Sequence, residues 1–289
     1  MTRCRAGVLT VRMAGFADTT NDCVSMTLQR KHNINVLGEG PAIVLLHGFG
    51  CDQNMWRLVV PAFARNHTVI LYDLVGSGQS ELAAYDHEKY GTLHGHADDL
   101  LDIVRSMTTE PVTVIGHSVS AMIALLAVNK APELFTAQVM VGPSACYIDD
   151  GDYRGGFSRA DIDELLETME GNYLGWSSAV APQIMGAPDR PDLREELTNS
   201  FCRTDPDIAK HFARVTFLSD HRADLAHCRL PTLILQCTDD FVAPVEVGEY
   251  IHRAIPGSEY VLIENTGHCP HLSAPDASVA AIRRFVQRG

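Results

Sequence analysis

The sequence predicts an α/β protein built on a mostly parallel sheet that is covered by helices on both faces. Short apolar, β-branched runs alternate with helical patterns from about residue 33 onward, as they do in chains that wind a parallel sheet. The expected strands are residues 34–37, 42–46, 68–71, 112–115, 138–141, 232–236 and 260–263. The helical patterns between them cover residues 55–64, 95–107, 121–129, 245–254 and 277–287.

The alternation stops between residues 146 and 226, where only helical patterns follow one another. They cover residues 158–169, 173–185, 192–201 and 205–218, and Pro206 stands at a first helical position. We expect this block to be a helical lid over the active site, inserted into a core made of residues 26–145 and 227–289. Residues 1–25 precede the regular pattern and are expected to form a flexible extension that contributes little to function.

Composition excludes several classes of protein. A chain of 289 residues with 46% hydrophobic content can bury a full core, and a formal charge of −13 without a basic patch disfavours nucleic-acid binding. The 8 cysteines show no C-x-x-C pair, which favours free thiols in a reducing cytoplasm over a disulfide framework. No apolar run is long enough for a transmembrane helix, so we expect no membrane partner.

The most informative motif is Gly-His-Ser-Val-Ser at residues 116–120. It follows the apolar run at residues 112–115 and precedes a run of small and apolar residues at 121–128. A serine on a sharp turn from strand to helix is the nucleophile elbow of serine hydrolases, in the pattern G-x-S-x-G. Ser118 is therefore the candidate nucleophile, and Ser120 replaces the usual last glycine at the cost of a hydroxymethyl group in a tight place.

A nucleophilic serine needs a base and an acid that orients the base, and in one large architecture these follow in the order Ser, Asp, His. His268 follows the strand pattern at residues 260–263 by a short loop and is the candidate base. Asp239 and Asp240 both follow the strand pattern at residues 232–236 and compete for the role of the acid. We favour Asp240, because the Asp-x-x-Ala-Pro spacing starts there, and we expect Asp239 to cap a turn.

The oxyanion hole is expected to use two backbone N–H groups, those of Val119 and Phe49. His-Gly-Phe-Gly at residues 47–50 follows a predicted strand directly, and its glycines allow the main chain to turn an amide toward Ser118. A plain glycine-rich turn is the alternative for this stretch. No metal or organic cofactor is implied: His94 and His96 lack further ligands at a suitable spacing and are expected to face solvent.

Apolar side chains of the lid have two possible tasks, packing on the core and lining a ligand pocket. For each of them, core packing is the open alternative. The residues that we expect to line the pocket are Phe157, Trp176, Val180 and Phe217, with Phe212 and Leu218 as further candidates.

With these motifs in view, the chain resembles one branch of the α/β-hydrolases. That branch contains the bacterial hydrolase that regulates the sigma-B general stress response and the plant strigolactone and karrikin receptors. The matching stretches are residues 47–53, 72–78, 116–122, 217–222 and 267–271, within a similarity from about residue 31 to the C-terminus. The lid is more similar to the bacterial regulator, whereas Ser120 is typical of the plant receptors, so the subgroup stays open.

The resemblance implies a triad of Ser118, Asp240 and His268, with oxyanion amides on Phe49 and Val119. It also implies a small hydrophobic ligand, slow hydrolysis of an ester or enol-ether butenolide bond, and signalling through a protein partner, for which the lid offers a moving surface. Three functions remain open: a hydrolase with an acyl-serine intermediate, a ligand sensor of slow turnover, and another acyl-transfer or carbon–carbon chemistry on the same triad. Dehalogenases and epoxide hydrolases are disfavoured, because they carry an aspartate where Ser118 stands.

Overall fold

A seven-stranded sheet forms the centre of the computed structural model, which describes residues 27–288; the predicted extension at residues 1–25 lies outside the described residues. The strand order is β1-β3-β2-β4-β5-β6-β7; β1 pairs antiparallel with β3, and the other neighbours pair in parallel. The predicted α/β class with a mostly parallel sheet is confirmed. The strands are β1 (Asn35–Leu37), β2 (Ala42–Leu46), β3 (Thr68–Leu71), β4 (Val112–His117), β5 (Phe135–Val141), β6 (Thr232–Asp239) and β7 (Glu259–Thr266).

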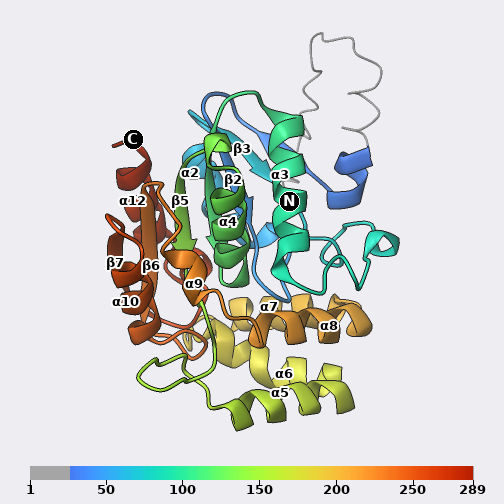
Figure 1. Ribbon diagram of the computed structural model, residues 1–289. Helices are drawn as coiled ribbons and strands as arrows, with labels where there is room; N and C mark the ends of the chain where they lie inside the picture. The colour runs from blue at the N-terminus through green and yellow to red at the C-terminus, as the bar shows by residue number, and fades with distance from the viewer. Residues whose placement is uncertain (1–26, 289) are drawn as a thin grey trace, which may run out of the picture.

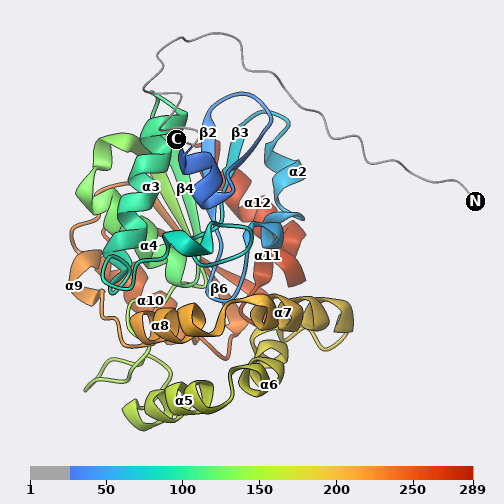
Figure 2. The same ribbon diagram turned by 90° about the vertical axis from the view of Figure 1, so that its right-hand side faces the viewer.

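Helices cover both faces of this sheet. Figure 2 shows α3 and α4 on one side of the strands, and α2 and α12 on the other. The α-helices are α2 (Val60–Phe63), α3 (Leu93–Met107), α4 (Val119–Lys130), α5 (Arg159–Gly171), α6 (Tyr173–Met185), α7 (Pro191–Arg203), α8 (Pro206–Phe217), α9 (Arg222–Leu225), α10 (Val245–Ala254), α11 (Pro270–Ser273) and α12 (Pro275–Val286). Short 3₁₀ turns are η1 (Gln53–Trp56), η2 (Leu82–Ala84) and η3 (Pro132–Leu134). Within residues 27–288 no helix combines the length and the apolar character needed to cross a bilayer.

The apolar runs that predicted the strands are buried on both faces. In β2, Ile43 and Leu45 belong to the core layer that includes α2 and α12, whereas Val44 and Leu46 belong to the layer that includes α3 and α4. Successive side chains of a strand point to opposite faces, so a run without polar interruptions supplies two cores at once. Burial of these four side chains is at least 99% complete.

One predicted helix, at residues 55–64, is wrong as a continuous element. The structure has the 3₁₀ turn η1 and then the single turn of α2. Pro61 lies in the first turn of α2, where its missing N–H costs nothing. Farther inside a helix, the proline ring would clash with the carbonyl four residues back, so the helix has to start again here.

The helices α5 to α8 form a separate layer that lies across the carboxyl ends of the strands (Figure 1). The start of α5 carries a capping box, in which the Ser158 hydroxyl accepts from the Asp161 N–H and the Asp161 carboxylate accepts from the Ser158 N–H. All four helices fall inside the block at residues 146–226 that the sequence predicts to be a lid. Its action as a lid stays a prediction.

Polar contacts fasten this layer to the core on the side of α7. The Arg57 guanidinium donates to both carboxylate oxygens of Glu196 over 2.6 and 2.5 Å. The Ser200 hydroxyl donates to the carbonyl of Gly50 over 2.8 Å, next to the predicted oxyanion loop. The ion pair is exposed, and such pairs contribute about 0–1 kcal/mol each, so these contacts hold the layer only weakly.

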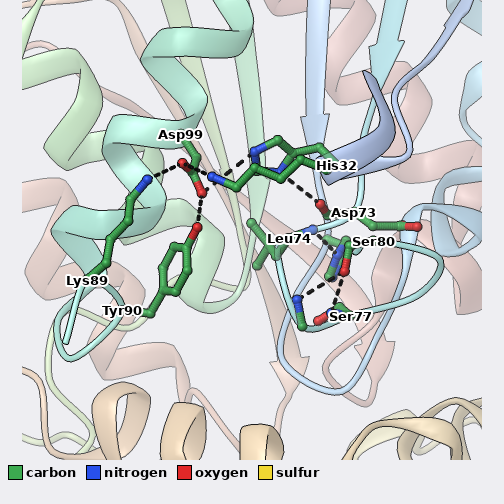
Figure 3. A network of polar contacts seen from close by, with 11 residues as sticks. His32, Asp73, Leu74, Ser77, Ser80, Lys89, Tyr90 and Asp99 are labelled. Carbon is green, nitrogen blue, oxygen red and sulfur yellow. Dashed lines mark hydrogen bonds and ion pairs between the residues drawn. The ribbon is translucent and has the colours of Figure 1, made fainter. Parts of the chain in front are cut away.

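A buried carboxylate in α3 organises a network of polar contacts beside β3 (Figure 3). Asp99, which is 2% exposed, accepts from Lys31 Nζ at 2.8 Å, Lys89 Nζ at 2.6 Å and Tyr90 Oη at 2.6 Å. Burial by itself raises the pKa of Asp99, but the hydrogen bonds from the two lysines and the tyrosine outweigh it and hold the pKa below its ordinary value. Asp99 is therefore a charged anchor between α3 and the chain before β1.

A second carboxylate, Asp73, fixes the loop that follows β3 (Figure 3). It accepts from the backbone N–H groups of Gln53 and Gln79, both at 2.9 Å. The next residue, Leu74, donates its N–H to Nε2 of His47 at 3.0 Å. The glycine-containing loop at residues 76–78 is thus tied to the loop that carries His47 and Phe49.

Candidate active site

Ser118 lies on the turn between β4 and α4, in a strained backbone conformation. Its φ is 56° and its ψ is −126°, values that side-chain-bearing residues rarely adopt. The Ser118 N–H donates to the carbonyl of Val141 on the neighbouring strand over 2.8 Å, which holds the turn in place. A Cβ at Gly116 would collide with the carbonyl of Ser120, so the first glycine of the motif is required by the close approach of helix and strand.

Ser118, His268 and Asp240 form one hydrogen-bonded chain. Nε2 of His268 lies 2.8 Å from the Ser118 hydroxyl, and its Nδ1 lies 2.7 Å from Oδ2 of Asp240. A carboxylate only accepts, so Nδ1 carries the proton and Nε2 is free to take one from Ser118. All three residues are more than 90% buried.

Backbone amides fix the orientation of Asp240. Its second oxygen accepts from the N–H groups of Val242 at 2.9 Å and Ala243 at 3.1 Å, so the carboxylate is held on both sides. Asp239, the competing candidate, is the last residue of β6 and is exposed. Of the two aspartates, the structure therefore brings Asp240 to His268.

His268 is also in contact with the lid. Its N–H donates to the carbonyl of Ile184 in α6 over 2.8 Å, and its carbonyl lies 2.9 Å from Nε2 of His117. Gly267 has a φ of 113°, and a Cβ there would collide with the carbonyl of Met185 at the end of α6. A displacement of α6 would therefore act directly on the candidate base.

The backbone N–H groups of Phe49 and Val119, predicted to form the oxyanion hole, are both available to donate a hydrogen bond. Among residues 27–288, the N–H groups of Phe49 and Val119 have no hydrogen-bond partner. Val119 is the first residue of α4, where a helix leaves its N–H groups unpaired and its dipole is positive. Both amides lie on segments adjoining Ser118: one follows it in the chain, and the other is on the loop after β2.

Ser120 joins these two segments, a role that the sequence did not reveal. Its side chain is fully buried, and its hydroxyl donates to the carbonyl of His47 over 2.5 Å. The Nε2 atom of the same histidine accepts from Leu74, so His47 is held by both its backbone and its ring. The serine that departs from the G-x-S-x-G pattern thus fastens the elbow to the loop of Phe49.

Replacing Gly48 with alanine is expected to lower kcat by about 100-fold, because catalytic groups that move by about 1 Å lose that much. A Cβ at this position would lie 2.6 Å from Nδ1 of His117 and 3.3 Å from Cβ of Ser118. The added methyl would force the elbow and the Phe49 loop apart. Ester hydrolysis and the melting temperature should be measured for Gly48→Ala and for Gly171→Ala, which has no atom within 4 Å of its added Cβ. Equal kcat values for the two variants would contradict the expectation.

Behind His268 lies a set of buried groups that the sequence did not indicate. One ligand atom each from His117, Cys269 and His271 lies within 4.8 Å of the others. Burial lowers the pKa of His271 to about 3 and that of His117 well below its ordinary value, so both rings are neutral. Ester hydrolysis by Ser118, His268 and Asp240 would not require a metal ion at these atoms. The two neutral rings and the thiol pack behind the candidate base.

The expectation that His96 faces solvent is wrong. His96 is 1% exposed, because its ring stacks on Tyr90 at 4.5 Å and packs against Phe212 at 4.9 Å between centroids. His94, two residues earlier on α3, is exposed as expected. A helix places residues two apart on different faces, a distinction that a count of ligand spacings does not capture.

Comparison with known proteins decides the family. The sequence model of a family described as "Alpha/beta hydrolase family" matches residues 43–282, which is most of the chain. The chain belongs to the alpha/beta hydrolase family. The fold, the elbow after β4 and the chain order of the three hydrogen-bonded residues agree with that membership.

The relatives of this hydrolase include plant proteins named as esterases and receptors. It is 37% identical to "Karrikin insensitive 2 receptor CA" of Petunia hybrida, over 90% of this chain and 97% of the relative. It is 38% identical to "Strigolactone esterase D14" of Arabidopsis thaliana over 89% and 96%, and 38% identical to "Strigolactone esterase RMS3" of Pisum sativum over 84% and 92%. The predicted resemblance to the plant strigolactone and karrikin receptors is confirmed.

A solved structure extends this likeness to three dimensions. A hydrolase from Oleispira antarctica shares 40% identity and a TM-score of 0.89, covering 92% of this chain and 98% of the other. The enol-lactonase from Burkholderia xenovorans, at 21% identity and a TM-score of 0.78, shares the fold; it covers 88% of this chain and 94% of the other.

The hydrolase has a narrow, largely apolar cavity of about 30 Å³ beside Ser118. Ser118 and His268 line it, and aromatic and aliphatic side chains from the core and from the helical block at residues 146–226 make most of its surface. The lining residues are Phe49, Cys51, His117, Ser118, Tyr147, Ile184, Leu197, Phe201, Thr216, Phe217, Val242, His268 and Cys269.

Of the four side chains predicted to line the pocket, Phe217 does so. Trp176 does not line the cavity, contrary to the prediction. It packs edge-on against Phe49, with 6.4 Å between the ring centroids. Phe157 does not line the cavity either: its ring contacts that of Phe241, with 5.8 Å between the centroids. Val180 lies one turn before Ile184 on α6 and packs against the core cluster instead of the cavity. Which residue of a lid helix faces the cavity depends on the rotation of that helix, which the sequence pattern does not determine.

Proposed function

We propose that this protein is a serine hydrolase acting on a small hydrophobic ester or a butenolide-like lactone. The observation that carries the proposal is the chain of hydrogen bonds from Asp240 through His268 to Ser118 at the wall of a buried apolar cavity. The names of the relatives support the same chemistry, since several are esterases. The free thiols of the described cysteines suit a cytoplasmic protein.

The proposed reaction has two steps. In the first, His268 takes the proton of Ser118, whose oxygen attacks the ester carbonyl, while the amides of Phe49 and Val119 bind the oxyanion. The protonated His268, stabilised by Asp240, then gives its proton to the leaving alcohol or enol and leaves an acyl-serine. In the second step a water molecule, deprotonated by His268, attacks this acyl group. The bond between the acyl carbon and Ser118 Oγ then breaks, His268 returns the proton to Ser118, and the acid is released. Neither step calls for a cofactor or a metal.

A second candidate function is that of a ligand sensor, in which the same triad turns over slowly and the lid recruits a protein partner. The observation that favours it is the contact between the candidate base and α6, in which the His268 N–H donates to Ile184. Relatives named as receptors support the same possibility. Acylation or ligand binding at Ser118 would then be transmitted to the lid at residues 146–226.

The hydrolase proposal is tested by a time course with 4-nitrophenyl acetate, followed by mass spectrometry of the peptide that contains Ser118. We expect many product molecules per protein and a transient acetyl group on Ser118. A burst of about one product per protein followed by a stall, together with ligand-dependent protection of residues 146–226 from proteolysis, would favour the sensor. Product without an adduct on Ser118, or no product at all, would contradict both functions.

A further inference from the structure

One polar side chain in the wall of the cavity has no partner. Thr216 in α8 lines the cavity and is 1% exposed, and its hydroxyl has no hydrogen-bond partner among residues 27–288. A buried hydroxyl without a partner lowers stability, and native structures keep few of them. This loss of stability indicates that the Thr216 hydroxyl finds a hydrogen-bond partner only when a ligand fills the cavity.

Other threonines of the lid show that the helix itself offers a partner. In α7, the Thr198 hydroxyl donates to the carbonyl of Arg194 over 2.8 Å, and that of Thr204, which directly follows the helix, donates to the carbonyl of Ser200 over 3.3 Å. A bond to the carbonyl four residues back is the usual arrangement for threonine in a helix. Thr216 does not make it, although α8 continues through that position.

Besides Thr216, the described lining of the cavity contains the hydroxyl groups of Ser118 and Tyr147. Phe217 follows Thr216 on the same helix, and its ring packs against Tyr147 at 5.1 Å between centroids. Burial raises the pKa of Tyr147 to about 12, and Tyr147 lines the same cavity as Ser118. Tyr147 thus serves the reacting end of the cavity, whereas Thr216 belongs to the lid wall.

We propose that the Thr216 hydroxyl is a polar subsite that selects substrates with a second oxygen, a carbonyl or ether oxygen outside the reacting ester. The inference rests on the proposed hydrolase function and narrows its substrate class from hydrophobic esters to oxygenated ones. Thr216 acts as a specificity-determining residue: it donates one hydrogen bond to the bound substrate and takes no part in proton transfer. An all-carbon substrate of the same size leaves the hydroxyl unpaired and is bound less tightly.

The size of the selectivity follows from the strength of a single neutral hydrogen bond. A substrate oxygen that accepts from Thr216 should gain about tenfold in kcat/KM over the methylene analogue. The methylene analogue is disfavoured because it leaves the buried Thr216 hydroxyl unpaired. Valine has nearly the volume of threonine and lacks the hydroxyl, so Thr216→Val removes the donor alone.

The test uses 4-nitrophenyl esters of matched length in which one methylene is replaced by oxygen: pentanoate, 2-ethoxyacetate and 3-methoxypropanoate. For at least one oxygenated ester, the kcat/KM ratio to pentanoate should fall about tenfold in Thr216→Val relative to the wild type. Intrinsic reactivity cancels, because each ratio is compared between two proteins. Thr198→Val, which removes a lid hydroxyl outside the cavity, should keep the wild-type ratios.

A second measurement checks the unpaired state directly. Without ligand, Thr216→Val should melt about 2–4 °C above the wild type, because a methyl group replaces an unpaired hydroxyl. Identical ratios in wild type and variant for every ester, or a melting temperature that falls, would overturn the subsite while leaving the hydrolase proposal intact. Failure of all the proteins to hydrolyse any ester would instead overturn the hydrolase proposal.

Discussion

Replacing Ser118 with alanine is expected to lower kcat for aryl esters by about 10⁴-fold or more, which corresponds to at least about 5 kcal/mol of transition-state stabilisation. The variant lacks the oxygen that would form the acyl intermediate, and His268 is left with no proton to take from it. The oxyanion amides and the apolar cavity remain, so some acceleration over the reaction in water should persist. The measurement is kcat in a continuous assay, with the melting temperature recorded for each protein.

Ser178→Ala is the matched control for this variant. Ser178 is exposed on α6, and within the described part of the chain its hydroxyl has one weak contact, with the Cys202 thiol at 3.9 Å. The control should keep the wild-type kcat and melting temperature. A Ser118→Ala protein that is folded and retains more than about a tenth of the wild-type kcat would show that another group is the nucleophile.

Lowering the pH from about 6.5 to about 4.5 is expected to remove several kcal/mol from the free energy of unfolding. Burial lowers the pKa of His96 and of His271 to about 3 and that of His32 to about 4. Below about pH 6.5 the unfolded chain protonates these side chains and the folded one does not, so stability falls as the pH falls toward those values. Each group contributes about 1.4 kcal/mol per pH unit, so these histidines together remove a large part of a typical net stability of about 5–15 kcal/mol.

The measurement is chemical denaturation at several values between about pH 7 and about pH 4.5 for the wild type and His96→Phe. Both ring nitrogens of His96 lack a hydrogen-bond partner among residues 27–288 and the ring packs on Tyr90, so phenylalanine keeps the stacking and removes the titrating group. The variant should lose less stability over this range, by about 2–3 kcal/mol. His227→Gln, at an exposed position, is the control. A wild type that is equally stable at both ends of the range would contradict the expectation.

The sequence predicted which edge of the sheet carries Ser118, Asp240 and His268, because each follows a recognisable strand and parallel strands end at the same edge. Their catalytic roles remain predictions. What sequence could not predict are contacts between segments far apart in the chain, such as the bond from Ser120 to His47, since a hydroxyl in a tight turn is read only as a steric cost. The break before Pro61, by contrast, was available from the sequence, because proline beyond the first turn of a helix is disfavoured.

The lining of the cavity was the least predictable part. Apolar residues such as Trp176 and Phe217 look alike in a helical pattern, and both are buried, yet only the second reaches the cavity. The difference is set by how α6 and α8 are rotated against the core, a property of the packed layer and not of either helix. Thr216 was missed for the same reason: a threonine between apolar neighbours carries no sign that its hydroxyl is unpaired.

The hydrogen bond between Ser118 and His268 joins residues 150 positions apart, with the whole helical block and the last strands of the sheet between them. During synthesis on the ribosome, the elbow and its amides emerge first, long before the base and the acid. A nascent chain that ends before β7 would therefore carry a serine hydroxyl with no group to activate it. In the proposed mechanism, hydrolysis begins only after the last strand has joined the sheet, so the appearance of activity would report the completion of folding.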